Sequence, residues 1–353
     1  MTSAATNTSS PGDNPRLTPN QAEAIARERY GLTGTATDLP SERDRNFRLD
    51  CGAAGTFVLK VFNTAEDEEF VEAQRCVFEV LGNPDTGAPT GTQPSVFPTL
   101  VPTTGGAAYT HTVLGETSHA LWLMPWLPGR RVAEVGELTR PLLHDIGAVL
   151  GQLDAVLARN PQPAARRTFV WAPQTAPDVI ARSLHVLHGE QRELVEAALH
   201  DFAARVRPHL GALRVSLIHN DANDYNLLVE GDRVSAVLDF GDMLESYTVC
   251  DLAHALAYLM LDRDDPVAIA EGVAAGYQTV YRLTPVELGS LYDFVRLRLA
   301  LSVTLSALQQ SARPDDPYLS ISEEPAWRLL ARLAEGGPLH TRFQAAMLAV
   351  AGT

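Results

Sequence analysis

The most informative part of the sequence is Leu217-Ile-His-Asn-Asp-Ala-Asn-Asp-Tyr-Asn-Leu-Leu-Val229, followed by Val237-Leu-Asp-Phe-Gly-Asp242. It contains Asp221 just after a His-Asn pair, Asn226 five residues later, and Asp239 thirteen residues after that. Phosphoryl transfer from ATP uses these groups in this order: a carboxylate facing the acceptor hydroxyl, then two oxygen ligands for Mg²⁺. Each fragment alone is weakly specific, whereas the ordered set predicts a kinase.

The composition indicates a soluble globular protein. The chain has 353 residues, 45% of them hydrophobic and 20% charged, and this length leaves room for two domains. No run approaches the roughly 18 apolar residues that a membrane span requires. The net charge of -15 disfavours binding to nucleic acid or to anionic membranes. Such a charge either favours a cationic acceptor, for example an amine, or only supports solubility.

The cysteines and the first residues bear on where the protein resides. Cys51, Cys76 and Cys250 lie far apart without metal-like spacing, and their odd number argues against a disulfide framework. The sequence therefore predicts a cytoplasmic protein. Residues 1–16 are rich in Ser, Thr, Asn and Pro and lack an apolar core, which predicts a disordered tail and not a signal peptide.

Residues 17–124 mix helical and strand patterns, which predicts a small α/β lobe that binds the nucleotide. Thr18-Pro-Asn-Gln21 has the pattern of a capping box, so a helix should run to about Tyr30, where Gly31 can end it. Gly105-Gly106 is a hairpin signal. The other expected elements are a helix at 65–81 and strands at 46–50, 56–62, 99–102, 108–114 and 120–124.

The character of the chain changes at residues 125–130, a Pro-containing connector that predicts a hinge. Residues 131–353 then predict a larger helical lobe that holds the catalytic and metal site. One β interruption is expected there, a strand at 215–218 followed by a hairpin through the three-residue loop Glu230-Gly231-Asp232. Helices are expected at 138–158, 176–187, 189–209, 247–262, 265–282, 285–311, 323–335 and 338–350, and Thr284-Pro-Val-Glu287 is a second capping box. The predicted fold class is therefore α+β with two lobes.

The chemistry is expected around Asp221. A carboxylate that follows a strand can take the proton of an acceptor hydroxyl, although Asx-rich loops also use Asp to form turns. Asn226 and Asp239 lie on the two arms of the predicted hairpin and offer the hard oxygen ligands that Mg²⁺ prefers. The alternative is a polar pair that only satisfies the end of the hairpin.

Three further residues flank this set. Asp224 and Asp242 either contact the acceptor or serve as turn or cap residues. His219 is expected to be a packed, hydrogen-bonded support for the loop and not an acid–base group.

Lys60 lies inside the apolar strand Phe57-Val-Leu-Lys-Val-Phe62. An ammonium group there needs a counter-charge or a phosphate, because burying an unpaired charge is unfavourable. In a kinase a lysine at this position bridges the nucleotide phosphates and a helix glutamate. Glu72 is the favoured partner, and the alternatives are Glu66, Glu68 and Glu69.

The sequence lacks both a Gly-x-Gly-x-x-Gly loop and a Walker A motif, which argues against a protein kinase. The turn between the first two strands contains Ser41 and Arg45, which either cover a phosphate or are ordinary polar turn residues. In the connector, Met124 and Trp126 are expected to contact adenine, and packing of the hinge itself is the alternative.

Together, His219-Asn-Asp221, Asn226, Asp239-Phe-Gly-Asp242, Lys60 and the connector resemble the aminoglycoside phosphotransferase/choline kinase family. The resemblance covers roughly residues 20–312. It implies a protein-kinase-like fold that uses ATP and Mg²⁺, with Asp221 as catalytic base and Asn226 and Asp239 as metal ligands. It also implies that Lys60 and Glu72 position the phosphates.

A finer resemblance is to the hydroxylysine kinase branch and to kinase domains fused to aminotransferases. It rests on residues 43–47, 70–74, 219–226 and 239–243. This branch implies an amino-alcohol or hydroxy-amino-acid acceptor such as hydroxylysine, homoserine, choline or ethanolamine. Arg298 matches an Arg of the branch and would hold an acceptor carboxylate, unless it only forms a salt bridge on a helix surface.

Three alternatives remain to an ATP-dependent kinase of a small amino alcohol. They are an aminoglycoside phosphotransferase, an inert nucleotide-binding module that regulates a partner, and a metal-dependent hydrolase. A hydrolase lacks the second His/Asp cluster it would need. The acceptor, the choice of ATP over GTP and the oligomeric state stay open, because acceptor contacts depend on how the helical lobe folds.

Overall fold

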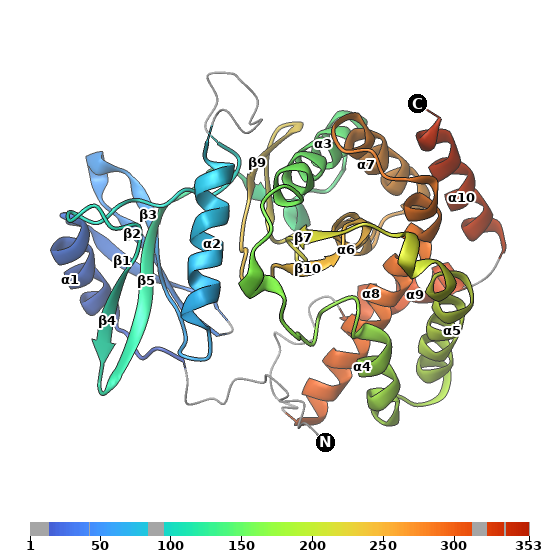
Figure 1. Ribbon diagram of the computed structural model, residues 1–353, viewed down its shortest axis with the longest axis horizontal. Coiled ribbons are helices and arrows are strands. Elements are labelled where there is room, and N and C mark those ends of the chain that lie inside the picture. Colours follow the sequence, from blue (N-terminus) through green and yellow to red (C-terminus); the bar gives the residue numbers. More distant parts are fainter. Residues whose placement is uncertain (1–13, 42, 84–94, 313–322, 335–336, 353) are drawn as a thin grey trace. The chain divides into compact units, whose positions relative to one another are not determined.

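The computed structural model describes residues 14–41, 43–83, 95–312, 323–334 and 337–352 (Figure 1). The chain divides into two units, Met1–Pro128 and Gly129–Thr353, and this boundary falls inside the predicted connector. Most of the predicted tail at 1–16 lies outside the described residues.

The first unit contains a five-stranded antiparallel sheet and two helices. Its strand order is β1-β2-β3-β5-β4, with β1 at Thr35–Leu39, β2 at Arg45–Asp50, β3 at Thr56–Val61, β4 at Thr110–Leu114 and β5 at Thr117–Pro125. Helices α1 (Pro19–Tyr30) and α2 (Glu68–Leu81) pack on opposite faces of the sheet. Successive side chains of a strand alternate between the two faces, so one strand can contact both helices. On β5, Leu121 and Leu123 join the core cluster that contains α1, and Trp122 contacts Phe78 of α2.

The elements of this unit follow their local signals closely. The capping box at Thr18 forms, and Gly31 ends α1 in a left-handed conformation with φ 67°. The predicted strand at 99–102 was wrong, because this segment forms only an isolated bridge at Val101. Gly105-Gly106 lies in a turn closed by hydrogen bonds between Thr103 and Ala107, but the paired strands β4 and β5 turn at Gly115. Edge strand β1 was not expected.

The second unit is mainly helical, as predicted. Its helices are α3 (Arg140–Leu157), α4 (Ala176–Ser183), α5 (Gly189–Arg205), α6 (Val249–Leu259), α7 (Pro266–Val280), α8 (Pro285–Ala312), α9 (Glu323–Ala334) and α10 (Gly337–Ala351). Each overlaps a predicted range. The second capping box forms at the start of α8, where Glu287 accepts a hydrogen bond from the backbone N–H of Thr284. No helix within the described ranges is long and apolar enough to cross a membrane.

Five short strands interrupt the helices. Strand β7 (Val215–Ile218) pairs with β10 (Leu244–Tyr247), and β6 (Arg130–Arg131), β8 (Leu227–Glu230) and β9 (Arg233–Val237) form a second sheet. The predicted β7 and the β8–β9 hairpin are confirmed, whereas β6 and β10 were not expected. The hairpin loop has two residues, not three, because Glu230 pairs directly with Arg233.

Two glycines bring α3 and α7 into backbone contact. A Cβ atom at Gly147 of α3 would overlap the carbonyl oxygen of Val273, and one at Gly276 of α7 would overlap that of His144. Only glycine allows this approach, since any side chain would push the helices apart. The close packing places the polar residues of α3 and α7 beside each other in the core.

Candidate active site

Asp221 lies on the loop between β7 and β8 and makes contact with three polar groups. Its Oδ1 atom is 3.2 Å from Nη2 of Arg298 and accepts a hydrogen bond from Asn223 at 3.0 Å. Its Oδ2 atom accepts one from Nδ2 of Asn226 at 2.9 Å. The pKa of Asp221 is raised to about 8, mainly by burial; the charges of Asp242 and Asp239 contribute to the rise, and Arg298 opposes it. The loop thus presents a half-buried carboxylate with unusual basicity.

Asn226 and Asp239 flank one end of the β8–β9 hairpin, where the N–H of Leu238 donates to the carbonyl of Asn226. Because Nδ2 of Asn226 also donates to the Asp221 carbonyl, its amide oxygen is left facing away from Asp221. Asp239 has a left-handed backbone with φ 54°, a strained conformation that is concentrated at functional sites. Two hard oxygen donors suit Mg²⁺, which takes few protein ligands. No larger cluster of His, Cys, Asp and Glu that could hold a metal occurs in the described residues.

The backbone before Asp221 is held by α6. Asp251 accepts hydrogen bonds from the backbone N–H groups of His219 and Asn220, at 2.8 and 2.6 Å. Nδ1 of His254 lies 2.9 Å from the carbonyl oxygen of Asn220, whose φ of 67° is left-handed. Sequence reasoning missed Asp251 and His254, although two polar residues in the otherwise apolar stretch Val249–Leu259 were a usable signal.

His219 supports the loop, as predicted from the sequence. It is fully buried, and its Nε2 lies 2.9 Å from the Leu238 carbonyl oxygen. Its Nδ1 accepts the N–H of Asp221 at 3.2 Å, so Nε2 carries the hydrogen. The ring also packs edge-on against Phe240. These bonds link the loop to the strand that leads into Asp239.

Arg298 of α8 is buried in the core and does not form a surface salt bridge. Its guanidinium group lies 4.7 Å from the centre of the Trp171 ring and 5.5 Å from that of Tyr258, whose hydroxyl is also close enough to share a hydrogen bond with it. Nη2 contacts Asp221, whereas Nε and Nη1 are buried and have no hydrogen-bond partner within the described part of the chain. Neither aromatic residue was expected from the sequence, because each lies on a separate, distant segment.

Asp224 faces a cavity of about 290 Å³. Its Oδ1 atom is buried without a partner in the described ranges, and burial raises the pKa of the carboxyl to about 6. Tyr258 lines the same cavity, so one aromatic residue borders both Arg298 and the Asp224 cavity. The other walls include Val132, Ala133, Tyr225, Leu261 and Arg263.

In the first unit, Lys60 is buried and pairs with a different acid from the one predicted. Its Nζ atom is 3.0 Å from Oδ2 of Asp44, whose other oxygen accepts two hydrogen bonds from Asn63. Glu72, the predicted partner, instead forms an ion pair with Arg75 at 2.9 Å. Glu72 lies one helical turn from Arg75, and this local pairing wins over a bond to the sheet. Asp44 precedes β2 and was not considered.

The other predicted nucleotide contacts are exposed or half-buried. Ser41 is exposed, and Arg45 forms an ion pair with Asp38 at 2.7 Å. Met124 pairs with Val58 across β5 and β3, and Trp126 is 40% exposed beneath the guanidinium of Arg48.

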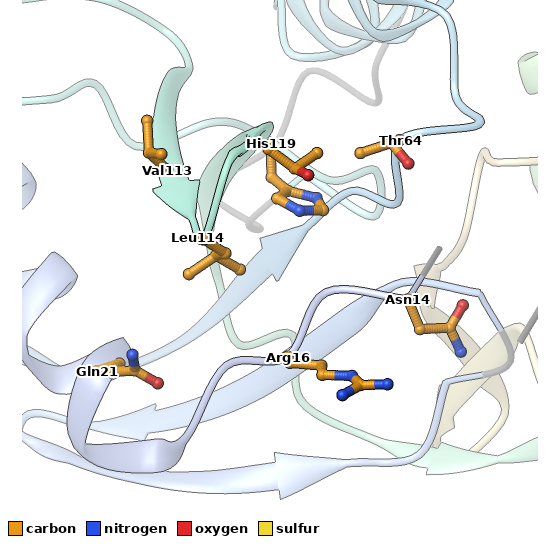
Figure 2. Close-up of a pocket in the computed structure, with 9 residues that line it drawn as sticks. Asn14, Arg16, Gln21, Thr64, Val113, Leu114 and His119 are labelled. Atoms are coloured by element: carbon orange, nitrogen blue, oxygen red, sulfur yellow. The ribbon is translucent and has the colours of Figure 1, made fainter. Parts of the chain in front are cut away.

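A cavity of about 380 Å³ in this unit contains none of these residues (Figure 2). Its walls come from the segment before α1, the first turn of α1, the segment after β3 and the β4–β5 hairpin, and they include Arg16, Gln21, Thr64, Leu114 and His119. The cavity therefore gives no support to the predicted nucleotide contacts.

An α/β unit followed by a helical unit that carries this loop defines a phosphotransferase with a protein-kinase-like fold. A model of the phosphotransferase enzyme family matches residues 35–287, and the chain belongs to that family. Hydroxylysine kinase of Danio rerio is 30% identical over 337 residues, covering 92% of this chain and 93% of that protein. The Mus musculus protein of the same name is 29% identical over 347 residues, covering 92% and 91%.

Solved structures share the fold at lower identity. Amicoumacin kinase hAmiN has a TM-score of 0.68 at 15% identity, covering 92% of this chain and 95% of that one. A microcompartment-associated aminopropanol kinase has a TM-score of 0.66 at 18% identity, covering 89% and 96%. The predicted family and fold class are confirmed. The chain is a small-molecule kinase that transfers a phosphoryl group to a hydroxyl group, with ATP as co-substrate.

Proposed function

We propose that the chain phosphorylates the side-chain hydroxyl of a hydroxy amino acid of the hydroxylysine type, with Mg²⁺-ATP as donor. The observation that carries this proposal is the buried guanidinium of Arg298 beside Asp221. Relatives named hydroxylysine kinase, similar over most of their length, point to the same acceptor.

Arg298 is suited to a carboxylate ligand. A buried guanidinium is stable only when its charge and its N–H groups are compensated, and here Nε and Nη1 lack partners in the described residues. A carboxylate can accept two parallel hydrogen bonds from an arginine fork. Choline, ethanolamine and aminoglycosides carry no carboxylate, so this arrangement favours an amino acid over all three.

Asp224 is suited to the amino group of the same acceptor. A buried carboxylate with an unpartnered oxygen gains stability from a cation, and a cavity lined by two acids, Asp224 and Asp262, and one arginine, Arg263, can take an alkylammonium group. Tyr258 would separate the ammonium in this cavity from the carboxylate at Arg298.

The proposed mechanism assigns one task to each predicted group. Asp221 accepts a hydrogen bond from the acceptor hydroxyl and takes its proton as the oxygen attacks the γ-phosphorus of ATP. Asn226 and Asp239 would hold Mg²⁺, which neutralises phosphate charge when bound. Lys60 exchanges Asp44 for the phosphates of the nucleotide.

A substrate panel tests the acceptor. The protein is incubated with Mg²⁺ and either ATP or GTP, and nucleoside diphosphate release is followed with 5-hydroxylysine, homoserine, ethanolamine, choline and an aminoglycoside. We expect turnover to be fastest with 5-hydroxylysine and to drop by about 100-fold with its carboxamide. The amide is neutral and has one oxygen, so it cannot accept two charge-assisted hydrogen bonds from the guanidinium of Arg298. Equal turnover of the acid and the carboxamide would contradict the proposal.

A matched pair of variants tests the residue. Arg296 and Arg298 are both buried on α8, but Arg296 pairs with Asp201 and Asp293, away from Asp221. Arg298→Lys should raise KM for 5-hydroxylysine and leave KM for its carboxamide unchanged, because lysine keeps the charge and loses the fork. Arg296→Lys should change neither KM. A rise of both constants in Arg298→Lys would assign that residue a structural role only.

A further inference from the structure

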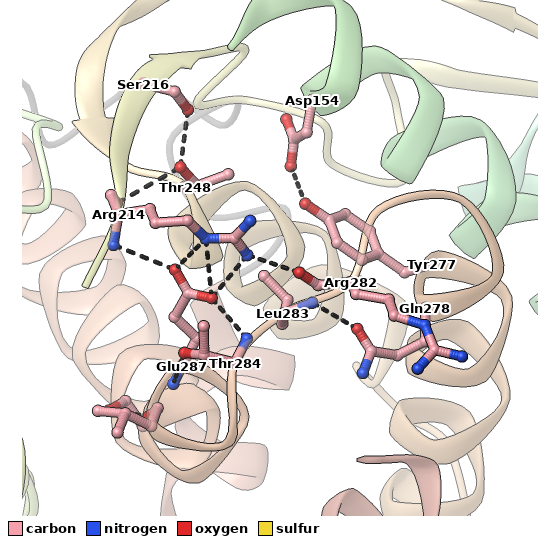
Figure 3. Close-up of polar contacts among 12 residues, drawn as sticks. Asp154, Arg214, Ser216, Thr248, Tyr277, Gln278, Arg282, Leu283, Thr284 and Glu287 are labelled. Atoms are coloured by element: carbon pink, nitrogen blue, oxygen red, sulfur yellow. Dashed lines mark hydrogen bonds and ion pairs between the residues drawn. The ribbon is translucent and has the colours of Figure 1, made fainter. Parts of the chain in front are cut away.

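Asp154 is a buried carboxyl group outside the Asp221 loop, and it lies next to Asp251, which holds that loop. Asp154 of α3 is fully buried, and the hydroxyl of Tyr277 of α7 donates a hydrogen bond to its Oδ2 atom (Figure 3). Its Oδ1 atom has no donor among the described residues. The carboxyl group of Asp251 on α6 lies beside it, close enough for a hydrogen bond between the two carboxyl groups. Two carboxyl groups can form such a bond only when one of them carries a proton.

The surroundings assign this proton to Asp154. Both oxygens of Asp251 already accept hydrogen bonds from backbone N–H groups, so Asp251 acts as the acceptor in this pair. Burial raises the pKa of Asp154 well above its ordinary value, and the charge of Asp251 adds to the effect. Arg214 acts in the opposite direction, but its guanidinium is bound to Glu287 (Figure 3).

We propose that neutral Asp154 donates a hydrogen bond to Asp251 and thereby positions the loop that carries Asp221. The chain of bonds runs from the Tyr277 hydroxyl through Asp154 and Asp251 to the backbone of His219 and Asn220. Asp154 touches no substrate in this scheme. It is a positioning residue that fixes the orientation of Asp251.

The loop needs such a support because its backbone is strained. Asn220 adopts a left-handed φ of 67°, and both polar atoms of its buried side chain lack partners in the described residues. Its conformation therefore depends on the bonds made by its backbone, to Asp251 and to His254. A rotation of the Asp251 carboxylate would release both N–H groups and shift Asp221, which follows directly.

Two substitutions of Asp154 distinguish its role as a hydrogen-bond donor from its role in filling space in the core. Asp154→Asn keeps the volume of the side chain. Its amide can accept a hydrogen bond from Tyr277 and donate one to Asp251, and it has no titratable proton. Asp154→Leu keeps much of the volume but donates nothing. We expect kcat for 5-hydroxylysine to stay within about threefold in Asp154→Asn and to fall by about 10- to 100-fold in Asp154→Leu, with KM for ATP unchanged in both.

Hydrogen exchange gives a readout that does not depend on the acceptor. The amides of His219 and Asn220 should exchange faster in Asp154→Leu and at the parental rate in Asp154→Asn. Asp293→Asn is the control, because Asp293 is buried in the same unit but binds Arg205. That variant should lower the melting temperature without changing exchange at the two amides. Equal exchange and equal kcat in the parent and Asp154→Leu would overturn the proposal, as would a loss in Asp154→Asn as large as in Asp154→Leu.

Discussion

Each unit of the molecule contains one buried ion pair at a predicted site, and the two pairs differ in how completely they are satisfied. Lys60 and Asp44 are 10% and 14% exposed, and Asp44 accepts two further hydrogen bonds from Asn63. Arg298 and Asp221 are 3% and 24% exposed. Asp221 is surrounded by donors, but Arg298 keeps two buried nitrogens without partners in the described ranges.

The difference distinguishes a closed ion pair from a ligand site: in a ligand site, buried N–H groups of the cation still lack an acceptor. A lysine presents a compact point charge, so Asp44 can stand in for a phosphate at Lys60. An arginine fork is matched by two oxygens, and Asp221 engages only one of its terminal nitrogens. The first pair therefore predicts exchange of one anion for another, and the second predicts addition of a ligand.

The largest effect is expected from Asp221→Asn. The amide retains the size of the carboxylate but cannot take a proton, so kcat should fall by about 10²- to 10⁴-fold. Binding of Mg²⁺-ATP, followed by thermal shift, should survive. If the variant keeps more than a tenth of the parental kcat, Asp221 is not the catalytic base. The ion pair between Arg298 and Asp221 would then no longer locate the acceptor.

Lys60→Met should have the next largest effect, and it should act on the other substrate. Loss of the ammonium removes a phosphate contact, so KM for ATP should rise by about 10- to 100-fold, or roughly 1.4 to 3 kcal/mol. KM for the acceptor should stay the same, in contrast with Arg298→Lys. Steady-state kinetics with each substrate varied in turn measure both constants. A rise in the acceptor KM alone would reverse the roles given to the two pairs.

Asp154 extends the comparison to a buried carboxyl without a cation. Its pKa is raised in the folded state, so the folded protein keeps a proton that the unfolded chain releases above about pH 4. The free energy of unfolding of the parent should therefore fall as the pH rises, by at most about 1.4 kcal/mol per pH unit from this group.

Denaturant unfolding of the parent and of Asp154→Asn measures this effect. The amide carries no such proton, so the stability difference should shift in favour of the variant between about pH 5 and 8. A difference that stays constant across this range would show that Asp154 is ionised in the folded protein. Urea titrations at fixed ionic strength keep the surface charges comparable.

The smallest effect is expected from Arg45→Ala. Arg45 and Asp38 form an ion pair at 2.7 Å, but their side chains are 38% and 47% exposed. Exposed pairs contribute about 0 to 1 kcal/mol, so the melting temperature should barely change. KM for ATP should rise by less than about threefold if Arg45, the first residue of β2, is only an ordinary polar residue. A tenfold rise would restore Arg45 as a phosphate contact.

Local sequence signals predicted the helices well. Capping boxes at Thr18 and Thr284 and the glycine at 31 determine helix ends through bonds between neighbours in the chain. The strands β1 and β6 were missed because they bury few side chains and so show little alternation. Strand β10 was missed because one of its buried residues is the polar Ser246, which hides the apolar pattern.

The partner of Lys60 shows where prediction of the site failed. Spacing along α2 placed Glu72 on a reasonable face, but Arg75 lies one turn away and takes its carboxylate. Asp44 pairs with Lys60 because β2 and β3 are neighbours, with Asn46 opposite Lys60. Strand register decides that contact, and register cannot be read from a charge pattern.

The sequence was enough to predict phosphoryl transfer, because Asp221, Asn226 and Asp239 occur in one short segment with the order and spacing that this chemistry uses. The distant side chains that contact this segment could be identified only from the folded structure. Arg298 lies 77 residues from Asp221 along the chain, and Asp154 lies on α3, far from the loop that it supports. Their contacts depend on how α3, α6 and α8 pack. Which face of each helix points inward depends on the close packing of many side chains throughout the core.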